Sequence, residues 1–212
     1  MKLVLIGAPA AGKGTQARKL IAHYDVAYIS TGDMLREEVA KETELGLKVK
    51  SVMASGALVS DDLIIEIVKS RIMQDDCKNG FLLDGFPRTK VQAEKLDELV
   101  GKVDRAIYLN VPDDVMLERI TARQTCPKCG ASYNKIFKPS KVADICDECG
   151  SKLVQRKDDT YEAGKERLKT FHEMSEPLVE YYNEKGVLFE VNGLGTIDEV
   201  FENIINNLGE RV

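Results

Sequence analysis

Residues 7–15, Gly-Ala-Pro-Ala-Ala-Gly-Lys-Gly-Thr, form a glycine-rich segment between a short apolar run and a helical pattern. Backbone N–H groups of such a segment, with the start of the next helix behind them, can hold phosphate oxygens, and Lys13 adds a mobile positive charge. The strict phosphate-loop pattern has Ser or Thr directly after the lysine, whereas here Gly14 intervenes and Thr15 follows. A plain turn without a ligand would explain the glycines but not the lysine.

Asp84 closes an apolar run, so its carboxylate is predicted at the carboxyl end of a strand, where ligands collect in open α/β sheets. A carboxylate beside a phosphate loop would repel the substrate unless it holds Mg²⁺ through water. Arg88 can fork onto a phosphate, and Gln92 can offer both a donor and an acceptor to a polar ligand. The alternative is a strand-to-helix turn with charges facing solvent.

Four of the five cysteines form two Cys-x₂-Cys pairs, Cys126 with Cys129 and Cys146 with Cys149, separated by 16 residues. This spacing is typical of a Cys₄ zinc site, and four thiolates leave no coordination position for water. We therefore predict a structural zinc, with two disulfides as the alternative in an oxidising compartment. Cys77 has no partner in the pattern and is interpreted as a plain buried or half-buried thiol.

The elements that must position these residues alternate between strands and helices. Short apolar runs predict strands at residues 2–6, 26–30, 80–83, 106–109 and 188–191. Helical spacing predicts helices near residues 12–24, 63–72, 93–100, 112–123, 161–185 and 196–208. Repeated strand–helix units favour an α/β fold with a parallel sheet flanked by helices. Residues 124–159 have no long helical period and are interpreted as an insertion.

Three local features refine this prediction. Residues 30–36 are interpreted as the start of a further helix with Thr31 as its cap, and Ser60 is a second expected cap. Arg119 and Arg123 are four residues apart, which would place both on one face of the helix after Pro112.

Composition limits the class of partner. The net charge of −5 argues against general affinity for nucleic acid, and no apolar run has membrane-spanning length. The apolar start of the chain is too short for a signal peptide and runs directly into the glycine-rich segment. We therefore expect a cytoplasmic monomer that acts on small molecules.

The phosphate segment, Gly-x-Pro-x-x-Gly-Lys-Gly-Thr, resembles that of nucleoside monophosphate kinases, and of adenylate kinases in particular. The resemblance covers essentially the whole chain and implies a P-loop NTPase-like fold with a five-stranded parallel sheet. It implies the reaction ATP + AMP = 2 ADP with Mg²⁺, and a zinc-binding long lid as in many bacteria. The implied parts are a core of residues 1–29, 60–121 and 160–212, an AMP-binding helical part of residues 30–59, and a lid of residues 122–159. The chain departs from the family at Ala10, Ser60 and Gln124, where Gly, Pro and Arg are usual.

The resemblance also implies roles for individual residues. Catalysis would rest on Lys13, Asp84, Arg88, Arg123, Arg156 and Arg167. ATP would be bound by Ala10, Ala11, Gly12, Lys13, Gly14, Thr15, Arg119, Arg123, Ser132, Tyr133 and Gly195. AMP would be bound by Thr31, Arg36, Ala57, Leu58, Val59, Gly85, Phe86, Pro87, Arg88, Gln92, Arg156 and Arg167, with Gly56 in the same pocket wall. Asp158 and Asp159 would orient the lid arginines and latch the closed lid.

Other functions stay open at this point. A sibling kinase acting on UMP or CMP usually has a short lid, which the long insertion opposes, whereas an adenylate kinase that uses GTP is harder to exclude. A zinc-ribbon nucleic-acid binder would need a basic surface, and this chain is acidic. A nucleotide sensor without catalysis would be expected to lack part of the charged set, which is complete here.

Overall fold

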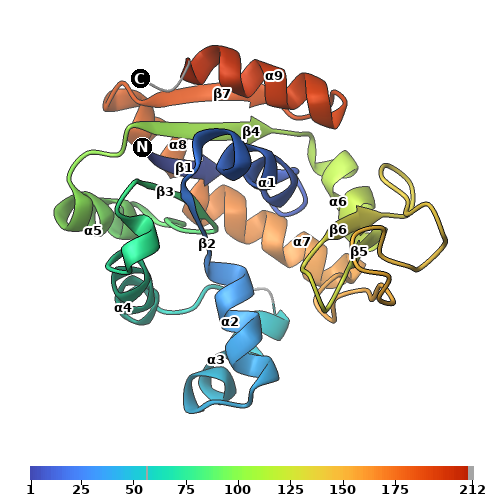
Figure 1. The fold of residues 1–212 in the computed structure, drawn as a ribbon. Coiled ribbons are helices and arrows are strands. Elements are labelled where there is room, and N and C mark those ends of the chain that lie inside the picture. The colour runs from blue at the N-terminus through green and yellow to red at the C-terminus, as the bar shows by residue number, and fades with distance from the viewer. Residues whose placement is uncertain (56, 210–212) are drawn as a thin grey trace.

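A computed structural model describes residues 1–55 and 57–209. The centre of the molecule is a five-stranded parallel sheet (Figure 1). Its order is β2-β3-β1-β4-β7. The strands are β1 (Lys2–Ile6), β2 (Ala27–Ser30), β3 (Phe81–Asp84), β4 (Arg105–Asn110) and β7 (Leu188–Asn192). All four neighbouring pairs run parallel. The predicted fold class, a five-stranded parallel sheet flanked by helices, is thus confirmed.

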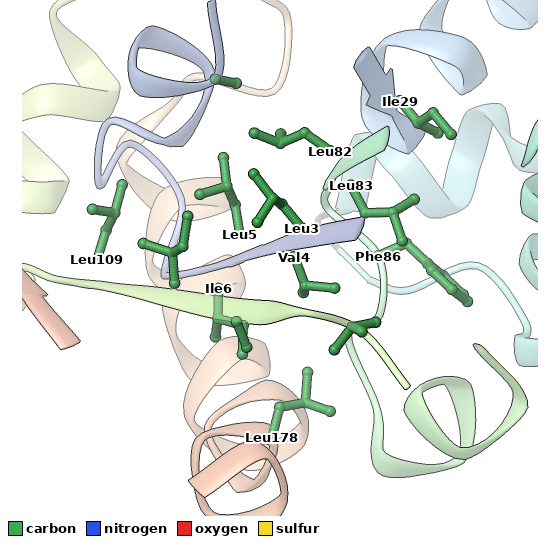
Figure 2. Close-up of a cluster of buried hydrophobic side chains, with 14 of the residues drawn as sticks. Leu3, Val4, Leu5, Ile6, Ile29, Leu82, Leu83, Phe86, Leu109 and Leu178 are labelled. Atoms are coloured by element: carbon green, nitrogen blue, oxygen red, sulfur yellow. The ribbon is translucent and has the colours of Figure 1, made fainter. Parts of the chain in front are cut away.

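Strand β1 is buried on both faces, which explains why its sequence is continuously apolar rather than alternating. Its residues from Leu3 to Ile6 are at most 3% exposed. Figure 2 shows them between side chains of the neighbouring strands and Leu178 of a covering helix. The register pairs Asp84 at the end of β3 with Leu5 of β1 and Ser30 of β2. The carboxyl ends of three strands therefore meet at one edge of the sheet.

Helices cover this sheet on both faces (Figure 1). The helices of the described residues are α1 (Lys13–Tyr24), α2 (Thr31–Ala40), α3 (Glu44–Ser55), α4 (Asp61–Ile72), α5 (Lys90–Val100), α6 (Asp113–Thr121), α7 (Tyr161–Thr170), α8 (Pro177–Glu184) and α9 (Ile197–Leu208), with short 3₁₀ and π turns at Asp75–Cys77 and Phe171–Ser175. α1 packs against α9, and α5 packs against α4 and α8. Among the described residues, no helix combines the length and apolarity that crossing a bilayer requires.

Helices α2 and α3 form a hairpin that projects from the sheet (Figure 1). Thr43 closes the turn, because its hydroxyl bonds the Glu38 carboxylate at 2.5 Å and accepts from the Gly46 N–H at 3.0 Å. A Cβ at Gly46 would lie 2.1 Å from the Glu38 carbonyl oxygen, so only glycine lets the two helices come this close.

The insertion, residues 122–159, contains a small antiparallel sheet of its own. Strand β5 (Arg123–Thr125) pairs with β6 (Ser132–Asn134), and Thr125 also pairs with Val154. Ala131, Tyr133 and Leu153 form an apolar cluster with the buried cysteines, and Ala122 is buried at the start of the insertion. Few apolar side chains therefore hold this part together.

Two local predictions were wrong. The helix after Pro112 ends at Thr121, so Arg123 lies in β5 and does not share a helical face with Arg119. Thr31 is not the cap of α2. That cap is Ser30, which accepts from the Asp33 N–H at 3.3 Å.

The helical character expected over residues 161–185 is confirmed, but it is divided into α7, a π turn and α8. Pro177 has no N–H to continue the helical bonding, and the Glu176 N–H instead reaches the Phe171 carbonyl at 2.8 Å, five residues back. Ser60 does occupy the cap position of α4, but its side chain makes no capping bond.

Candidate nucleotide site

The phosphate loop lies between the end of β1 and the start of α1, as its sequence predicts. Ala10 has a φ of 63°, a left-handed conformation that costs a residue with a Cβ about 1–2 kcal/mol. The Lys13 ammonium bonds the carbonyl oxygens of Gly7 at 2.5 Å and Ala8 at 2.9 Å. Burial lowers the pKa of Lys13 to about 8; Asp84 opposes this change, and nearby arginines add to it.

Asp84 lies directly beside this loop. A Cβ at Gly14 would be 3.8 Å from the Asp84 Oδ2 atom, so the carboxylate and the start of α1 are close neighbours. The Tyr28 hydroxyl donates to the same Oδ2 at 3.0 Å. Burial, with the charge of Asp84 next, raises the pKa of the Tyr28 phenol, so the phenol keeps its proton and remains a donor. A carboxylate held in this way fits a water-mediated Mg²⁺ site.

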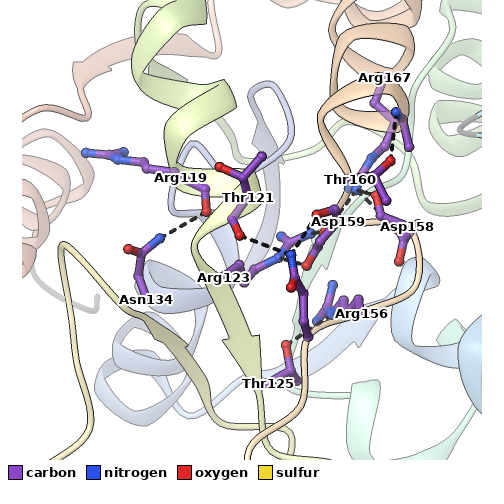
Figure 3. A network of polar contacts seen from close by, with 12 residues as sticks. Arg119, Thr121, Arg123, Thr125, Asn134, Arg156, Asp158, Asp159, Thr160 and Arg167 are labelled. Atoms are coloured by element: carbon purple, nitrogen blue, oxygen red, sulfur yellow. Dashed lines mark hydrogen bonds and ion pairs between the residues drawn. The ribbon is translucent and has the colours of Figure 1, made fainter. Parts of the chain in front are cut away.

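Arg123 and Arg167 converge on Asp159, whose side chain is fully buried (Figure 3). Arg123 forms a two-pronged pair with this carboxylate, with Nε 2.8 Å from Oδ2 and Nη2 bonded to Oδ1. Arg167 lies 3.2 Å from Asp158 and 3.4 Å from Asp159. Burial acts to lower the pKa of Arg123, but the bond and charge of Asp159 outweigh it and the pKa is raised.

A second group of arginines faces the α2 end of the site. Arg36 and Arg156 lie 2.5 Å and 3.6 Å from the same Asp33 oxygen. Burial, followed by the charge of neighbouring arginines, lowers the pKa of both Arg156 and Arg167 to about 10. Arg88, whose pKa burial also lowers, donates from Nε to the Gly85 carbonyl at 2.8 Å. Because these cations lie close together and repel one another, the site favours binding of an anionic ligand.

A cavity of about 580 Å³ collects these side chains. Nine Lys or Arg residues line it against three Asp or Glu, although the chain as a whole carries −5. Its lining includes every residue expected to bind ATP and every residue expected to be catalytic, together with Pro87 and Arg36. Such an excess of cations in a cleft favours polyanionic ligands.

A smaller cavity of about 70 Å³ adjoins it through shared residues such as Arg36, Arg88 and Arg167. The other residues that line it from the set expected to bind AMP are Thr31, Ala57, Leu58, Val59, Gly85 and Gln92. Phe86 is fully buried in the core and lines neither of these two cavities, so its side chain is not brought to the site. Gly56 lies outside the described residues.

Two of these residues have protein partners of their own. The Thr31 hydroxyl donates to the Gly85 carbonyl at 2.9 Å. The Gln92 amide accepts from the Arg88 N–H at 2.7 Å and donates to Asp61 at 2.6 Å. The Gln92 amide is therefore fixed in orientation before any base reaches it.

The four cysteines of the insertion come together, with their sulfur atoms all within 4.8 Å of one another. The two turns that carry them match: the backbone carbonyl oxygens of Cys126 and Cys146 accept from the N–H groups of Gly130 and Gly150, at 3.0 and 2.9 Å. The shortest sulfur separations, 3.4 and 3.5 Å, exceed a disulfide bond of about 2.05 Å. They approach the roughly 3.8 Å edge of a tetrahedron with zinc–sulfur bonds of about 2.3 Å. The donor set thus fits zinc.

Several lining residues were not foreseen from the sequence. Phe137 comes from the insertion and places its ring 5.4 Å from the Arg119 guanidinium. Tyr28 and Gln16 line the large cavity, and Met53 lines the small one. A signal existed for Gln16, which directly follows the phosphate segment, but none for Phe137, because its place depends on how the insertion folds back.

Comparison with known proteins agrees with this geometry. A model of the family described as adenylate kinase matches residues 5–187. A protein of Clostridium acetobutylicum named adenylate kinase is 52% identical, with 99% of this chain and 100% of that protein covered. Proteins of the same name from Clostridium tetani and Caldicellulosiruptor saccharolyticus are 51% and 48% identical, with 99% of each chain covered.

Proposed function

Since this chain belongs to the adenylate kinase family, whose members are phosphotransferases, we propose that it catalyses the reversible reaction ATP + AMP = 2 ADP. The observation that carries the proposal is the pair of adjoining cavities that share arginines. Two anionic nucleotides could meet there with their phosphates toward the same cations. The partners are therefore the small molecules ATP, AMP and ADP.

The donor phosphates would lie in the phosphate loop, against its backbone N–H groups and Lys13. A transferring phosphoryl group spreads negative charge over its oxygens and needs stabilisation of that charge more than covalent help. Lys13, Arg123 and Arg167 would supply it, once phosphate oxygens replace Asp159 as their partner. When bound, Mg²⁺ would neutralise further charge on the phosphates, and Asp84 is the carboxylate that would hold it through water.

The acceptor would lie in the small cavity, with its phosphate between Arg36 and Arg88 and its base toward Gln92. Ala57, Leu58 and Val59 would form the apolar wall against the adenine. Asp158 lines this same cavity and is paired with Arg167, which supports a role in orienting that arginine.

The insertion would act as a lid over the donor, and residues 30–59 as the part that closes on the acceptor. Contacts of the insertion with the rest of the chain support this: Arg156 lies near Asp33, and Glu148 lies 3.4 Å from Arg18 of α1. Zinc held by all four cysteines would be structural and leave no open coordination position. Ligand thiols must stay reduced, which favours the cytoplasm. A single chain supplies both cavities, which favours a monomer.

The test is a coupled assay that measures ADP formed from ATP with AMP, UMP, CMP or GMP as acceptor. We expect turnover with AMP at least about tenfold above the other acceptors, since one matched base contact contributes roughly that factor. Equal rates with UMP or CMP would contradict the proposal and indicate a kinase of pyrimidine nucleoside monophosphates. Binding of ATP without ADP formation would contradict it and indicate a nucleotide sensor.

A further inference from the structure

Gln16 has a buried side-chain oxygen without a partner. The residue lies in the first turn of α1 and is 3% exposed. Its Nε2 atom donates to the Ile197 carbonyl at 3.0 Å, whereas Oε1 meets no hydrogen-bond donor among the described residues. Because the Ile197 carbonyl can only accept, the amide nitrogen must face it, and the orientation of Oε1 is fixed. An unmade hydrogen bond of this kind costs a protein about 1–3 kcal/mol.

Gln16 is one of the residues that line the large cavity, together with Arg119 and the segment from Gly193 to Ile197. Leu194, Ile197 and Val200 are apolar members of the same lining. The Arg119 guanidinium donates to the Gly193 carbonyl at 3.1 Å and so is held as one wall. An apolar slot beside a planar cation suits a nucleotide base rather than a phosphate.

We propose that Gln16 selects the base of the phosphoryl donor, with Oε1 accepting a hydrogen bond from the exocyclic amino group of adenine. The inference rests on the proposed function, because it assumes that the donor phosphates occupy the phosphate loop. Purines with a 6-oxo group, such as guanine and hypoxanthine, carry an acceptor where adenine carries this donor. Two acceptors facing each other repel, and a buried amide left unpaired disfavours the wrong base. The bond to Ile197 keeps the oxygen aimed at the base.

The decisive probe is purine riboside triphosphate, which lacks only the amino group of ATP. For the wild-type enzyme we expect kcat/KM with ATP to exceed that with this analogue, and with ITP, by about 10- to 100-fold. In Gln16→Met, which preserves volume but cannot hydrogen-bond, this preference should fall to within about threefold. A ratio within one enzyme does not depend on the fraction that is folded.

Lys19→Met is the matched control. Lys19 lies on the same helix and pairs with Asp198 next to Ile197, so its loss loosens the same region without changing the Gln16 oxygen. The donor preference of this variant should equal that of the wild type. A loss of preference in Lys19→Met as large as in Gln16→Met would assign the effect to loop position and overturn the proposal.

Two further outcomes would overturn it. If Gln16→Met slows ATP and the amino-free analogue equally, the residue is structural only. If the wild type itself uses both donors equally, the proposal fails even should the variant not fold. Neither result touches the phosphotransferase reaction, which would fail only if ATP and AMP gave no ADP.

Discussion

The phosphate loop follows β1, whose residues from Leu3 to Ile6 are at most 3% exposed, whereas the apolar cluster of the insertion consists of Ala131, Tyr133 and Leu153 with the buried cysteines. Apolar burial on both faces of β1 fixes the loop with respect to Asp84. In the insertion, the cysteine cluster and the buried ion pairs of Asp159 hold the segments together. The first region therefore resists change by apolar packing, and the second depends on ion pairs and on the cysteine cluster.

This contrast has a consequence for function. Apolar packing does not depend on a ligand, so the loop should stay formed whether or not a nucleotide is bound. Ion pairs between Asp159 and arginines can be exchanged for pairs with phosphate oxygens at modest cost, because both are oxyanions. A region held in this way can respond to substrate, which is what a closing lid requires.

The largest expected effect is on the rigid side of the comparison. Lys13→Met removes a positive charge that would stabilise the transferring phosphoryl group in the transition state, so kcat should fall by about 10²- to 10³-fold. The fold should persist, because the variant no longer buries an ammonium group. The coupled assay and thermal unfolding followed by circular dichroism measure the two quantities. With Lys19→Met as control, turnover of Lys13→Met within threefold of wild type would refute the role of Lys13.

On the charge-held side, Asp159→Asn should lower stability by about 3 kcal/mol, since it leaves buried Arg123 without its anion. Thermal unfolding should report a decrease of roughly 6–12 °C, at about 2–4 °C per kcal/mol for a chain of this size. ATP should restore part of this loss, because its phosphate oxygens replace the carboxylate. Asp198→Asn, at an exposed pair, is the control. A loss no greater than in this control would show that the pair contributes little.

The metal side of the insertion is tested by Cys129→Ser. Three cysteines cannot complete the tetrahedron, so zinc content and melting temperature should both fall, the latter by roughly 5–10 °C. Turnover at moderate temperature should change less, since none of the four cysteines lines the large cavity. Cys77→Ser, outside the cluster, should keep its zinc. If chelation abolished turnover of a still folded enzyme at low temperature, zinc would have more than a structural role.

The same contrast explains which features the sequence predicts. Strand β1 is predictable because burial on both faces demands an apolar run, and the position of Asp84 follows from the end of its strand. The cysteine cluster is predictable because its spacing is local. Each of these depends on few distant contacts.

The features that were missed depend on contacts between distant segments. Arg123 fits the helical period of Arg119, but pairing with Asn134 of β6 draws it into a strand. Ser30 and Thr31 are equally good caps by residue type, and the bond from Thr31 to Gly85 decides between them. The α2–α3 hairpin requires the close approach at Gly46, which no periodicity encodes.

A smaller effect concerns the pH dependence of the loop. Because the pKa of Lys13 is lowered from 10.5 to about 8, the free enzyme should lose this charge as the pH rises through 8. The ratio kcat/KM for ATP, which reports free-enzyme groups, should be flat below pH 8 and fall by up to about tenfold per pH unit above it. The free energy of unfolding should change in the opposite direction and rise with pH between about 8 and 10.5. In that window the unfolded chain binds more protons than the folded one, so the cost of burying the charged Lys13 is progressively removed. In Lys13→Arg, the fall in kcat/KM near pH 8 should be absent, and its persistence would assign it to another group.

The smallest expected effect tests whether the rigid loop itself stores strain. Ala10 adopts a left-handed backbone that glycine accepts freely, so Ala10→Gly should relieve about 1–2 kcal/mol in the folded state. Glycine also gains about 0.5–1 kcal/mol of entropy in the unfolded chain, so the net stabilisation should lie between about 0 and 1.5 kcal/mol. Ala11→Gly, at a buried neighbour without positive φ, lacks the relief and should destabilise the protein. Denaturant unfolding of both variants measures the difference. Equal destabilisation would mean that packing, rather than backbone conformation, sets the tolerance of this loop, and the loop would then be held in the same way as the strands beneath it.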